Sequence, residues 1–416
     1  MNSIKTVLAL LLLFTLAACD ASNMAVSGDP CARGLADCDH DGVCETDVTV
    51  AASCGGCGVI CPSGPHSTPT CSHGLCAITC SPGFDDCDAE ATNGCESDLS
   101  TPGTCGSCSN SCGDACVDGA CASCDAPLGL ASNDPLDAAR ALGLCGDSLI
   151  SARWVLADGA APPTDPTPAA GFALGHGILP DFGSNLMPRE GAQLLALSSG
   201  TARRPADPGY QNIHSFGFAK GYTGNPPMGF PRPSPACPGV ETGGVNDPTA
   251  LELELKAPDW AKGFAFDFDF YTFEWPMFVC SPYNDFFVAI LSPVPEGQVD
   301  GDISFDAMGN PISVNAAFVS VCGCNGGPPC WAGGRPFTCP DGVDELLETG
   351  FDQDTNGLRH AATSWLTTTA PVMPGQTITL RLAIYDSADQ SLDSTVLLDK
   401  FRWLPRSPVV TTVPIQ

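Results

Sequence analysis

Two segments in the second half of the chain alternate between apolar and polar side chains. In residues 251–256 leucine alternates with glutamate or lysine, and in residues 264–271 phenylalanine alternates with alanine, aspartate or tyrosine. Successive side chains of a strand point to opposite faces, so a period of two predicts strands with one buried and one wet face. We interpret the phenylalanines as core rather than as a platform for a ligand.

Three further segments extend this pattern toward the C-terminus. Residues 286–291 are continuously apolar, residues 378–384 alternate again, and residues 395–403 supply a last strand. Several short strands separated by turns favour an antiparallel arrangement. The sequence therefore predicts a mainly β fold, an antiparallel β-sandwich of jelly-roll type.

Helical periodicity is rare in this chain. Residues 135–144 have helical spacing, with Asn133 or Asp134 as the cap and Pro135 in the first turn. A short helix is expected near residues 341–349. Residues 159–171 and 223–239 are rich in proline and glycine and are expected to form long surface loops.

The N-terminus has the pattern of an export signal. Lys5 precedes an apolar run over residues 7–14, which is shorter than the roughly 20 residues of a transmembrane helix. Leu16-Ala17-Ala18-Cys19 then resembles the bacterial lipobox, which implies cleavage before Cys19 and lipid on its thiol. The alternative is an ordinary secretory signal cut near Ala18. Residues 1–18 are thus expected to be a lipoprotein signal peptide, and 19–30 a tether.

Cysteine usage divides the chain and supports an oxidising compartment. Apart from Cys19, 17 of the 25 cysteines lie between residues 31 and 124, and seven lie between 145 and 339. If every thiol is oxidised, two odd groups require an odd number of bridges between them, and we expect Cys124 to pair with Cys145. The Cys-x2-Cys pairs at 54–57 and 105–108 could bind zinc in a cytosolic protein, but export favours disulfides.

The first cysteine group contains an internal repeat. Four cysteines at 44, 54, 57 and 61 recur at 95, 105, 108 and 112, each displaced by 51 positions. Because large apolar residues are few, crosslinks must replace a hydrophobic core. We expect residues 31–124 to be a disulfide-rich, loop-rich region of two units that serves as a stalk or spacer. Asp39, Asp41 and Asp47 could bind calcium there, but solvated loop acids are favoured, since the spacing is not that of an EF-hand.

The strand region resembles a known domain family. Residues 271–291, with the sequence YTFEWPMFVCSPYNDFFVAIL, look like the signature of the choice-of-anchor L domain, and residues 310–315 and 380–401 resemble its later motifs. The resemblance covers about residues 249–405, preceded by an N-terminal part with one helix and long loops (125–248) and followed by a tail (406–416). With the cysteine repeats, the arrangement is similar to surface lipoproteins of myxobacteria, which implies surface display without an established activity.

Composition limits the possible partners and chemistry. The formal net charge of −30, about −31 without Lys5, excludes a basic nucleic-acid-binding surface. The chain lacks a His-Glu-x-x-His motif and a Gly-x-Ser-x-Gly elbow, so the sequence gives no support for catalysis. Glu274 and Asp285 could form the carboxylate pair of a glycoside hydrolase, but we favour structural roles for both.

Acidic residues gather in two neighbouring parts of the predicted sandwich. They are Glu274, Asn284 and Asp285 in one motif, Asp386, Asp389 and Asp393 in one turn, and Asp399 on the last strand. Calcium prefers six to eight such oxygen ligands, so we hypothesise one ion near the 386–393 turn, with Glu274, Asp285, Asp386, Asp389 and Asp393 as its ligands. The alternative is that Asp386 and Asp393 cap the turn through backbone amides.

Three functional classes are compatible with these features. The leading hypothesis is a non-enzymatic, lipid-anchored surface protein whose sandwich binds a glycan or another surface protein in adhesion or matrix contact. A structural envelope component without a soluble ligand is the second, and a secreted glycoside hydrolase the third. Asp20 favours the inner membrane in enteric bacteria, but the myxobacterial resemblance favours the outer membrane and cell surface.

Overall fold

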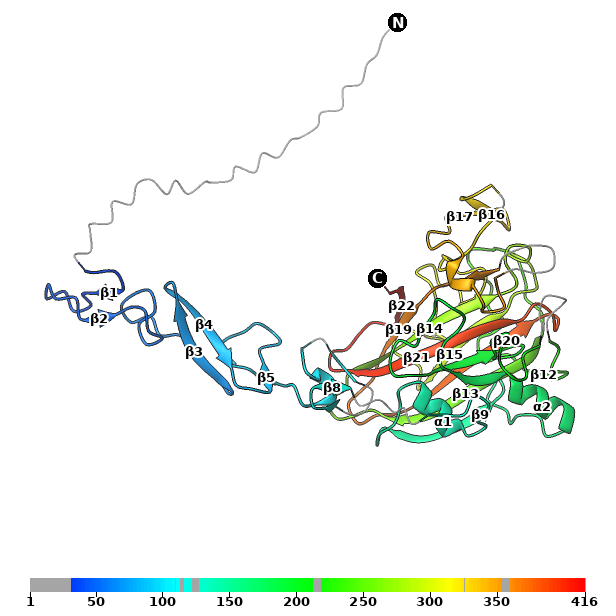
Figure 1. The fold of residues 1–416 in the computed structure, drawn as a ribbon, viewed down its shortest axis with the longest axis horizontal. Coiled ribbons are helices and arrows are strands. Elements are labelled where there is room, and N and C mark those ends of the chain that lie inside the picture. The colour runs from blue at the N-terminus through cyan, green and yellow to red at the C-terminus, as the bar shows by residue number, and fades with distance from the viewer. Residues whose placement is uncertain are drawn as a thin grey trace, which may run out of the picture. The chain divides into compact units, whose positions relative to one another are not determined.

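The computed structural model describes residues 31–108, 110–112, 116–121, 127–211, 218–324, 326–352 and 360–415 (Figure 1). Cys19 and Cys124 lie outside these residues. The chain divides into two compact units, residues 1–96 and 97–416.

The first unit consists of short strands and turns held by disulfides. Its strands are β1 (Leu35–Ala36), β2 (Thr46–Asp47), β3 (Ser67–Ser72), β4 (Leu75–Cys80) and β5 (Phe84–Asp85). β1 pairs with β2, and β3 pairs with β4 as a hairpin. The bridges are Cys31–Cys44, Cys38–Cys57, Cys54–Cys71, Cys61–Cys76 and Cys80–Cys95. Among its described residues, the buried hydrophobic side chains all belong to cysteines: Cys54, Cys61 and Cys95.

The sequence repeat corresponds to a repeated structure. Cys54 bonds to Cys71 on β3, and 51 positions later Cys105 bonds to Cys116 on β7 (Cys116–Val117), which forms a hairpin with β8 (Ala120–Cys121). A Cβ on Gly55 would lie 2.4 Å from the carbonyl oxygen of Gly74, and one on Gly106 would lie 2.1 Å from that of Gly119. Each repeat therefore needs glycine where its loop meets its hairpin.

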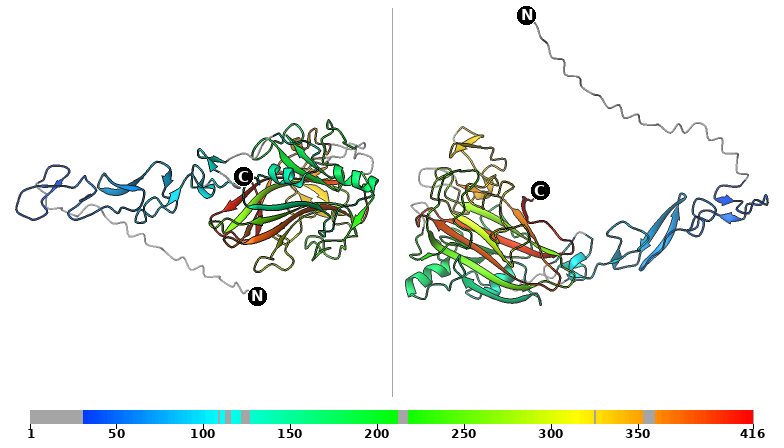
Figure 2. Two further views of the ribbon diagram at one scale, coloured as in Figure 1. Left: turned by 90° about the horizontal axis from the view of Figure 1, so that it is seen from below. Right: turned by 180° about the vertical axis from the view of Figure 1, so that it is seen from behind.

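The second unit contains two large antiparallel sheets (Figures 1 and 2). Within the described residues, one sheet has the order β10 (His176–Leu179), β11 (Leu194–Ser198), β21 (Ser394–Leu404), β14 (Gly263–Thr272), β19 (Leu366–Pro371) and β22 (Thr411–Pro414), with β18 (Ala361–Ala362) also on β14. The other has the order β12 (Thr223–Gly224), β13 (Val245–Lys256), β20 (Thr377–Ser387) and β15 (Phe286–Ser292), with β9 (Leu149–Val155) also on β13.

Smaller elements complete this unit. They are β6 (Ser97–Asp98), η1 (Pro102–Thr104), α1 (Pro135–Ala141), α2 (Pro166–Leu174), β16 (Cys330–Ala332), β17 (Arg335–Phe337) and η2 (Asp344–Leu346). Disulfides Cys322–Cys339 and Cys324–Cys330 close the segment that carries the β16–β17 hairpin, and Cys237–Cys280 joins two loops.

The main core lies between the two sheets. Alternate residues of β13 and β20 pack against the four phenylalanines of β14 and against β21, and α1 adds three alanines. This confirms the antiparallel sandwich and the assignment of the phenylalanines to the core. It also confirms α1, whose first turn is capped by the Asp134 carboxylate, 2.9 Å from the amide nitrogen of Leu136.

The second face of β14 differs from the prediction of a wet surface. All ten residues of β14 are buried, and residues from 179–196 and 343–351 form a second apolar cluster with Tyr271 on that face of the sheet. The loop predicted at 159–171 is also partly wrong, since its end belongs to α2. The helix expected near 341–349 is only the 3-10 turn η2.

Candidate functional site

The sandwich topology brings the predicted acidic residues to one end. β14 runs antiparallel to β21, with Thr272 opposite Ser394, and β15 runs antiparallel to β20, with Phe286 opposite Tyr385. The last residues of β14 and β20 therefore meet the first residues of β15 and β21. The acidic cluster at this end comprises Glu274 after β14, Asn284 and Asp285 before β15, Asp386 near the end of β20, Asp389 in the following turn, and Asp393 before β21.

Most of this cluster is inaccessible to solvent. The exposed fraction is 2% or less for Glu274, Asn284, Asp285, Asp386 and Asp393, whereas Asp389 is partly exposed. Burial, together with the charge of Asp285, raises the pKa of Glu274 to about 11. Burial raises the pKa of Asp285 to about 7, and burial and the neighbouring carboxylates raise those of Asp386 and Asp393. The cluster resists full ionisation in the absence of a compensating charge.

One buried lysine lies beside the cluster. The ammonium group of Lys220 donates to Ser198 O at 2.9 Å and to Thr249 Oγ1 at 2.7 Å, and its backbone amide donates to Asp247 at 2.9 Å. Burial lowers the pKa of Lys220 to about 8, against the raising effect of Asp247, Asp393 and Asp386. Lys220 therefore supplies one positive charge beside three buried carboxyl groups, those of Asp247, Asp386 and Asp393.

Several oxygen and nitrogen atoms in the cluster have no hydrogen-bond partner. Within the part of the chain that the structure describes, no donor reaches either carboxylate oxygen of Asp386, Oε2 of Glu274 or Oδ1 of Asp285, and both side-chain polar atoms of Asn284 are unpaired. Other atoms are satisfied. Asp285 Oδ2 accepts from Ser199 Oγ at 3.3 Å, and Asp393 Oδ2 accepts from the amide of Phe218 at 2.7 Å.

The turn itself is capped by another residue. Asp389 Oδ1 accepts from the amide of Ser391 at 3.1 Å, which is the side-chain contact of an Asx turn. Asp393 instead binds the segment at Phe218, and Asp386 accepts from no donor among the described residues. The geometry thus assigns capping to Asp389, not to Asp386 or Asp393.

Asp399 lies away from this cluster. In the middle of β21, its Oδ2 accepts from the amides of Arg189 at 2.6 Å and Glu190 at 3.3 Å, and its Oδ1 accepts from that of Lys400 at 2.6 Å. These contacts attach the 189–190 loop to the sheet. Burial raises the pKa of Asp399 to about 7.

Acidic groups with closely spaced oxygens occur in the first unit. Among the described residues, one carboxylate oxygen from each of Asp37, Asp39, Asp41 and Glu45 lies within 4.8 Å of the others, and Asp86, Asp88 and Glu96 form a similar group. Asp47 is elsewhere, bound to Thr49. We missed Asp37 and Glu45 from the sequence, although Glu45 recurs as Glu96 in the second repeat. These groups are partly or fully exposed, and the sandwich cluster is more loosely spaced than either.

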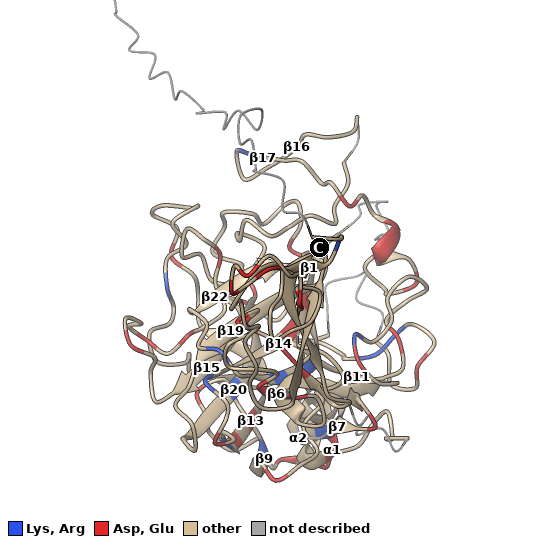
Figure 3. Ribbon diagram, turned by 90° about the vertical axis from the view of Figure 1, so that its left-hand side faces the viewer, with Lys and Arg blue, Asp and Glu red and all other residues tan. Residues whose placement is uncertain are grey.

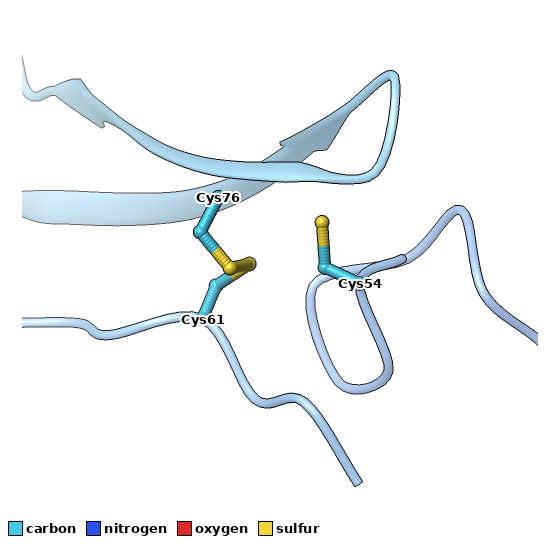
Figure 4. A group of neighbouring side chains, drawn as sticks. All are labelled: Cys54, Cys61 and Cys76. Atoms are coloured by element: carbon cyan, nitrogen blue, oxygen red, sulfur yellow. A yellow bond between two sulfur atoms is a disulfide. The ribbon is translucent and has the colours of Figure 1, made fainter. Parts of the chain in front are cut away.

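The cysteines proposed as an alternative zinc site are oxidised. Cys54 and Cys57 are disulfide-bonded, and so are Cys105 and Cys108. Figure 4 shows the Cys61–Cys76 disulfide beside Cys54. These thiols are therefore unavailable as thiolate ligands, which agrees with the disulfide interpretation. Cys145 is also disulfide-bonded, while its expected partner Cys124 lies outside the described residues.

The surface of the second unit has a pocket of about 610 Å³ that is lined by both polar and apolar atoms. Arg204 forms ion pairs there with Asp181 and, at 2.8 Å, with Asp207. The hydroxyl end of the half-buried Tyr210 side chain lies next to Gly350. Sequence reasoning missed this pocket because its residues come from two distant segments without a motif. Its lining is Asp181, Gly183, Arg204, Pro205, Ala206, Tyr210, Glu348, Gly350 and Asp352.

Acidic residues outnumber basic ones in the second unit. Figure 3 marks Asp and Glu in red and Lys and Arg in blue along the ribbon. Residues 236–401 match the family model of the choice-of-anchor L domain. This confirms the resemblance found in the sequence and indicates a bacterial protein associated with the cell surface.

No curated protein matches the chain, and no solved structure matches it. In the described residues, no helix is both long and apolar enough to cross a membrane.

Proposed function

We propose that this protein is a non-enzymatic, lipid-anchored surface protein whose sandwich binds a glycan in adhesion or matrix contact. The observation that carries the ligand class is the pocket at Arg204 and Tyr210. Its volume of about 610 Å³ is within the range of small-molecule sites and suits a short saccharide.

The pocket chemistry favours a polyhydroxylated ligand. Asp181, Glu348 and Asp352 supply carboxylate acceptors for sugar hydroxyls, while Arg204, fixed by Asp181 and Asp207, supplies donors in a defined direction. Tyr210 supplies an aromatic side chain against which a sugar ring can pack. Because acidic residues outnumber arginine among the described lining residues, we expect a neutral or amino sugar rather than an acidic one.

The anchor rests on the N-terminal sequence. The apolar run at 7–14, the lipobox-like residues 16–19 and the short polar tether fit a lipoprotein, and the disulfides fit a chain that folds outside the cytoplasm. A lipoprotein cysteine carries two or three acyl chains, enough for stable attachment. Residue Cys19 is the anchor in this proposal, with the outer membrane and cell surface as its address.

Cell fractionation tests the anchor. Wild-type protein should sediment with membranes and partition into detergent, whereas the Cys19→Ala variant should lose the lipid and the detergent partitioning. If both behave alike, the ordinary secretory signal is the correct interpretation. Protease treatment of intact cells then separates surface display from attachment to the inner membrane.

A polysaccharide binding panel tests the ligand. The chain produced without its lipidated cysteine, residues 20–416, should retain at least one envelope or matrix polysaccharide, and Tyr210→Ala should weaken that retention about tenfold, or ~1.4 kcal/mol. Tyr283→Ala serves as the control, because Tyr283 is exposed but does not line the pocket. Equal binding by both variants would remove the pocket from the proposal.

Treating the envelope extract with periodate or with protease separates a glycan from a protein partner. Periodate should abolish retention if a glycan is bound, and protease should do so if a surface protein is bound. Loss of envelope integrity on deletion, without a change in adhesion, would favour the structural alternative. Hydrolysis of any polysaccharide in the panel would favour the hydrolase, although Glu274 and Asp285 are too buried to meet a substrate in this conformation.

A further inference from the structure

The acidic cluster has an unbalanced charge in a dry environment. Glu274, Asp285, Asp386 and Asp393 are at most 2% exposed, and Lys220 is the buried cation beside them in the described residues. Burying unpaired carboxylates is costly unless a cation or protons neutralise them. The cluster therefore requires a further positive charge.

Protons alone leave part of the cluster unexplained. Protonated carboxyl groups would reduce the charge, but Asn284 is neutral, 1% exposed, and still has an unpaired side-chain oxygen and nitrogen. Buried amides are normally paired, because an unmet hydrogen bond costs about 1–3 kcal/mol. An unpaired amide oxygen beside carboxylates indicates a missing electrophile, and a metal ion would balance the charge and bind the amide oxygen.

We propose that this end of the sandwich is a buried calcium site, with Asp386, Asp285, Glu274 and the side-chain carbonyl of Asn284 as its ligands. Five oxygens are without a donor among the described residues: Glu274 Oε2, Asn284 Oδ1, Asp285 Oδ1 and both oxygens of Asp386. These five, which include both oxygens of Asp386, make six or seven ligands with one or two waters, within the range of calcium. The set contains oxygen donors alone, which disfavours zinc.

The surroundings orient these ligands. Ser199 Oγ donates to the other oxygen of Asp285, and it accepts from the amide of Ser394 at 2.9 Å, which fixes Ser199 at the start of β21. Since the oxygens are not all within 4.8 Å of one another here, binding must draw the ligand side chains closer together. Asp389 and Asp393, held by Ser391 and Phe218, stay outside the coordination sphere.

The ion would join the two sheets. Glu274 follows a strand of the seven-stranded sheet, and Asp285 and Asp386 border strands of the five-stranded sheet. Calcium at this point would crosslink the sheet ends and stabilise the sandwich. A ligand that binds only the folded state raises the stability according to its free concentration.

Thermal melting with calcium chloride or a chelator tests this site in the chain of residues 20–416. Calcium at ~100 times its Kd should raise the sandwich melting temperature by about 5 °C or more, and magnesium should raise it less. Asp386→Asn should abolish the shift. In chelator, however, this variant should melt at or above the wild-type temperature, because an amide at this position needs neither a proton nor a cation to be neutral.

A second variant tests whether the exposed acidic residues of the first unit cause the response to calcium. Asp39→Asn combined with Asp41→Asn and Asp88→Asn should keep the calcium shift of the sandwich, and isothermal titration should give one site lost only in Asp386→Asn. The proposal is overturned if the wild-type sandwich transition does not respond to calcium. It is also overturned if the shift survives Asp386→Asn or disappears in the first-unit variant.

Discussion

At the scale of single residues, the buried carboxylate of Asp267 connects the outer face of β14 to neighbouring segments. Asp267 Oδ1 accepts from Arg402 at 2.9 Å and from Thr367 at 2.7 Å, and its Oδ2 lies 3.6 Å from Arg189 Nε. Sequence alternation identified Asp267 as outward-facing, which is correct. It gave no sign that this face is covered, because the covering segments lie far away in the sequence.

Asp267→Asn should therefore destabilise the sandwich. The neutral amide loses the attraction to both arginines and leaves them partly buried and unpaired, so we expect a loss of about 2–3 kcal/mol of unfolding free energy, measured by urea denaturation. Glu254→Gln, on the partly exposed Glu254 that accepts from Ser151, should change it by less than about 0.5 kcal/mol. Similar losses in the two variants would contradict the role given to Asp267.

His176 provides a second prediction, on pH dependence. It is buried and stacked on Trp154, and burial, followed by the charges of Arg203 and Lys220, lowers its pKa to about 3. The unfolded chain binds this proton near pH 6.5, so the folded state binds fewer protons between about pH 3 and 6.5. The stability contributed by neutral His176 is complete above pH 6.5 and is lost as the pH falls below it.

Replacing the imidazole tests this linkage. His176→Phe keeps a ring against Trp154 but does not titrate, so the difference in unfolding free energy between the wild type and the variant should fall by about 1.4 kcal/mol per pH unit below pH 6. Urea denaturation of both proteins from pH 5 to 7.5 gives this difference, in which the other titrating groups cancel. A difference independent of pH would show that His176 is not buried in neutral form.

At the scale of elements, local pattern predicted the strands whose two faces differ in sequence. β13, β14, β20 and β21 were predicted by alternation or apolar runs, and α1 by its cap and its proline. β10 and β11 were missed, since all of their residues are buried and no alternation marks them. α2 was missed because its prolines suggested a loop, although proline at N1 needs no amide partner.

The candidate site was predicted to a similar extent. Glu274, Asn284, Asp285 and Asp386 were identified because each lies at the boundary of a recognisable strand, where antiparallel neighbours meet. Lys220 and Ser199 were not, since they precede β14 by more than 40 residues in segments without periodicity. Contacts between sequence-distant loops depend on the packing of the whole sandwich, and local pattern does not contain that information.

Disulfides in the loops give a prediction at this scale. Cys237–Cys280 closes a separation of 43 residues, and Cys324–Cys330 closes one of six. The entropy of the unfolded chain predicts that replacing both cysteines with serine costs about 4 kcal/mol for the first bridge and about 2 kcal/mol for the second. Chemical denaturation of the two double variants gives both values, and an equal or larger loss for Cys324–Cys330 would rule out this entropic account.

At the scale of the whole molecule, the two units are stabilised by different means. In the described residues of the first unit, cysteine sulfur replaces the leucine and phenylalanine side chains that fill the sandwich core. A small domain without an apolar core depends on its crosslinks, because burial alone does not offset the entropy of ordering the chain. The sandwich has a continuous core of large side chains and does not depend on its bridges in the same way.

Reduction should therefore separate the stabilities of the two units. After treatment with dithiothreitol and alkylation, residues 31–96 should unfold and be digested by proteinase K, while a fragment containing residues 127–415 should resist digestion. Trypsin is unsuitable, since Arg33 is the sole lysine or arginine between residues 31 and 124. Mass spectrometry of the surviving fragments locates the boundary, and the unreduced chain, expected to resist digestion in both units, is the control. If residues 31–96 stay protected after reduction, side-chain packing and not crosslinking stabilises the first unit. In that case, the exposed acidic groups of the cysteine repeats would be the next candidates for their function.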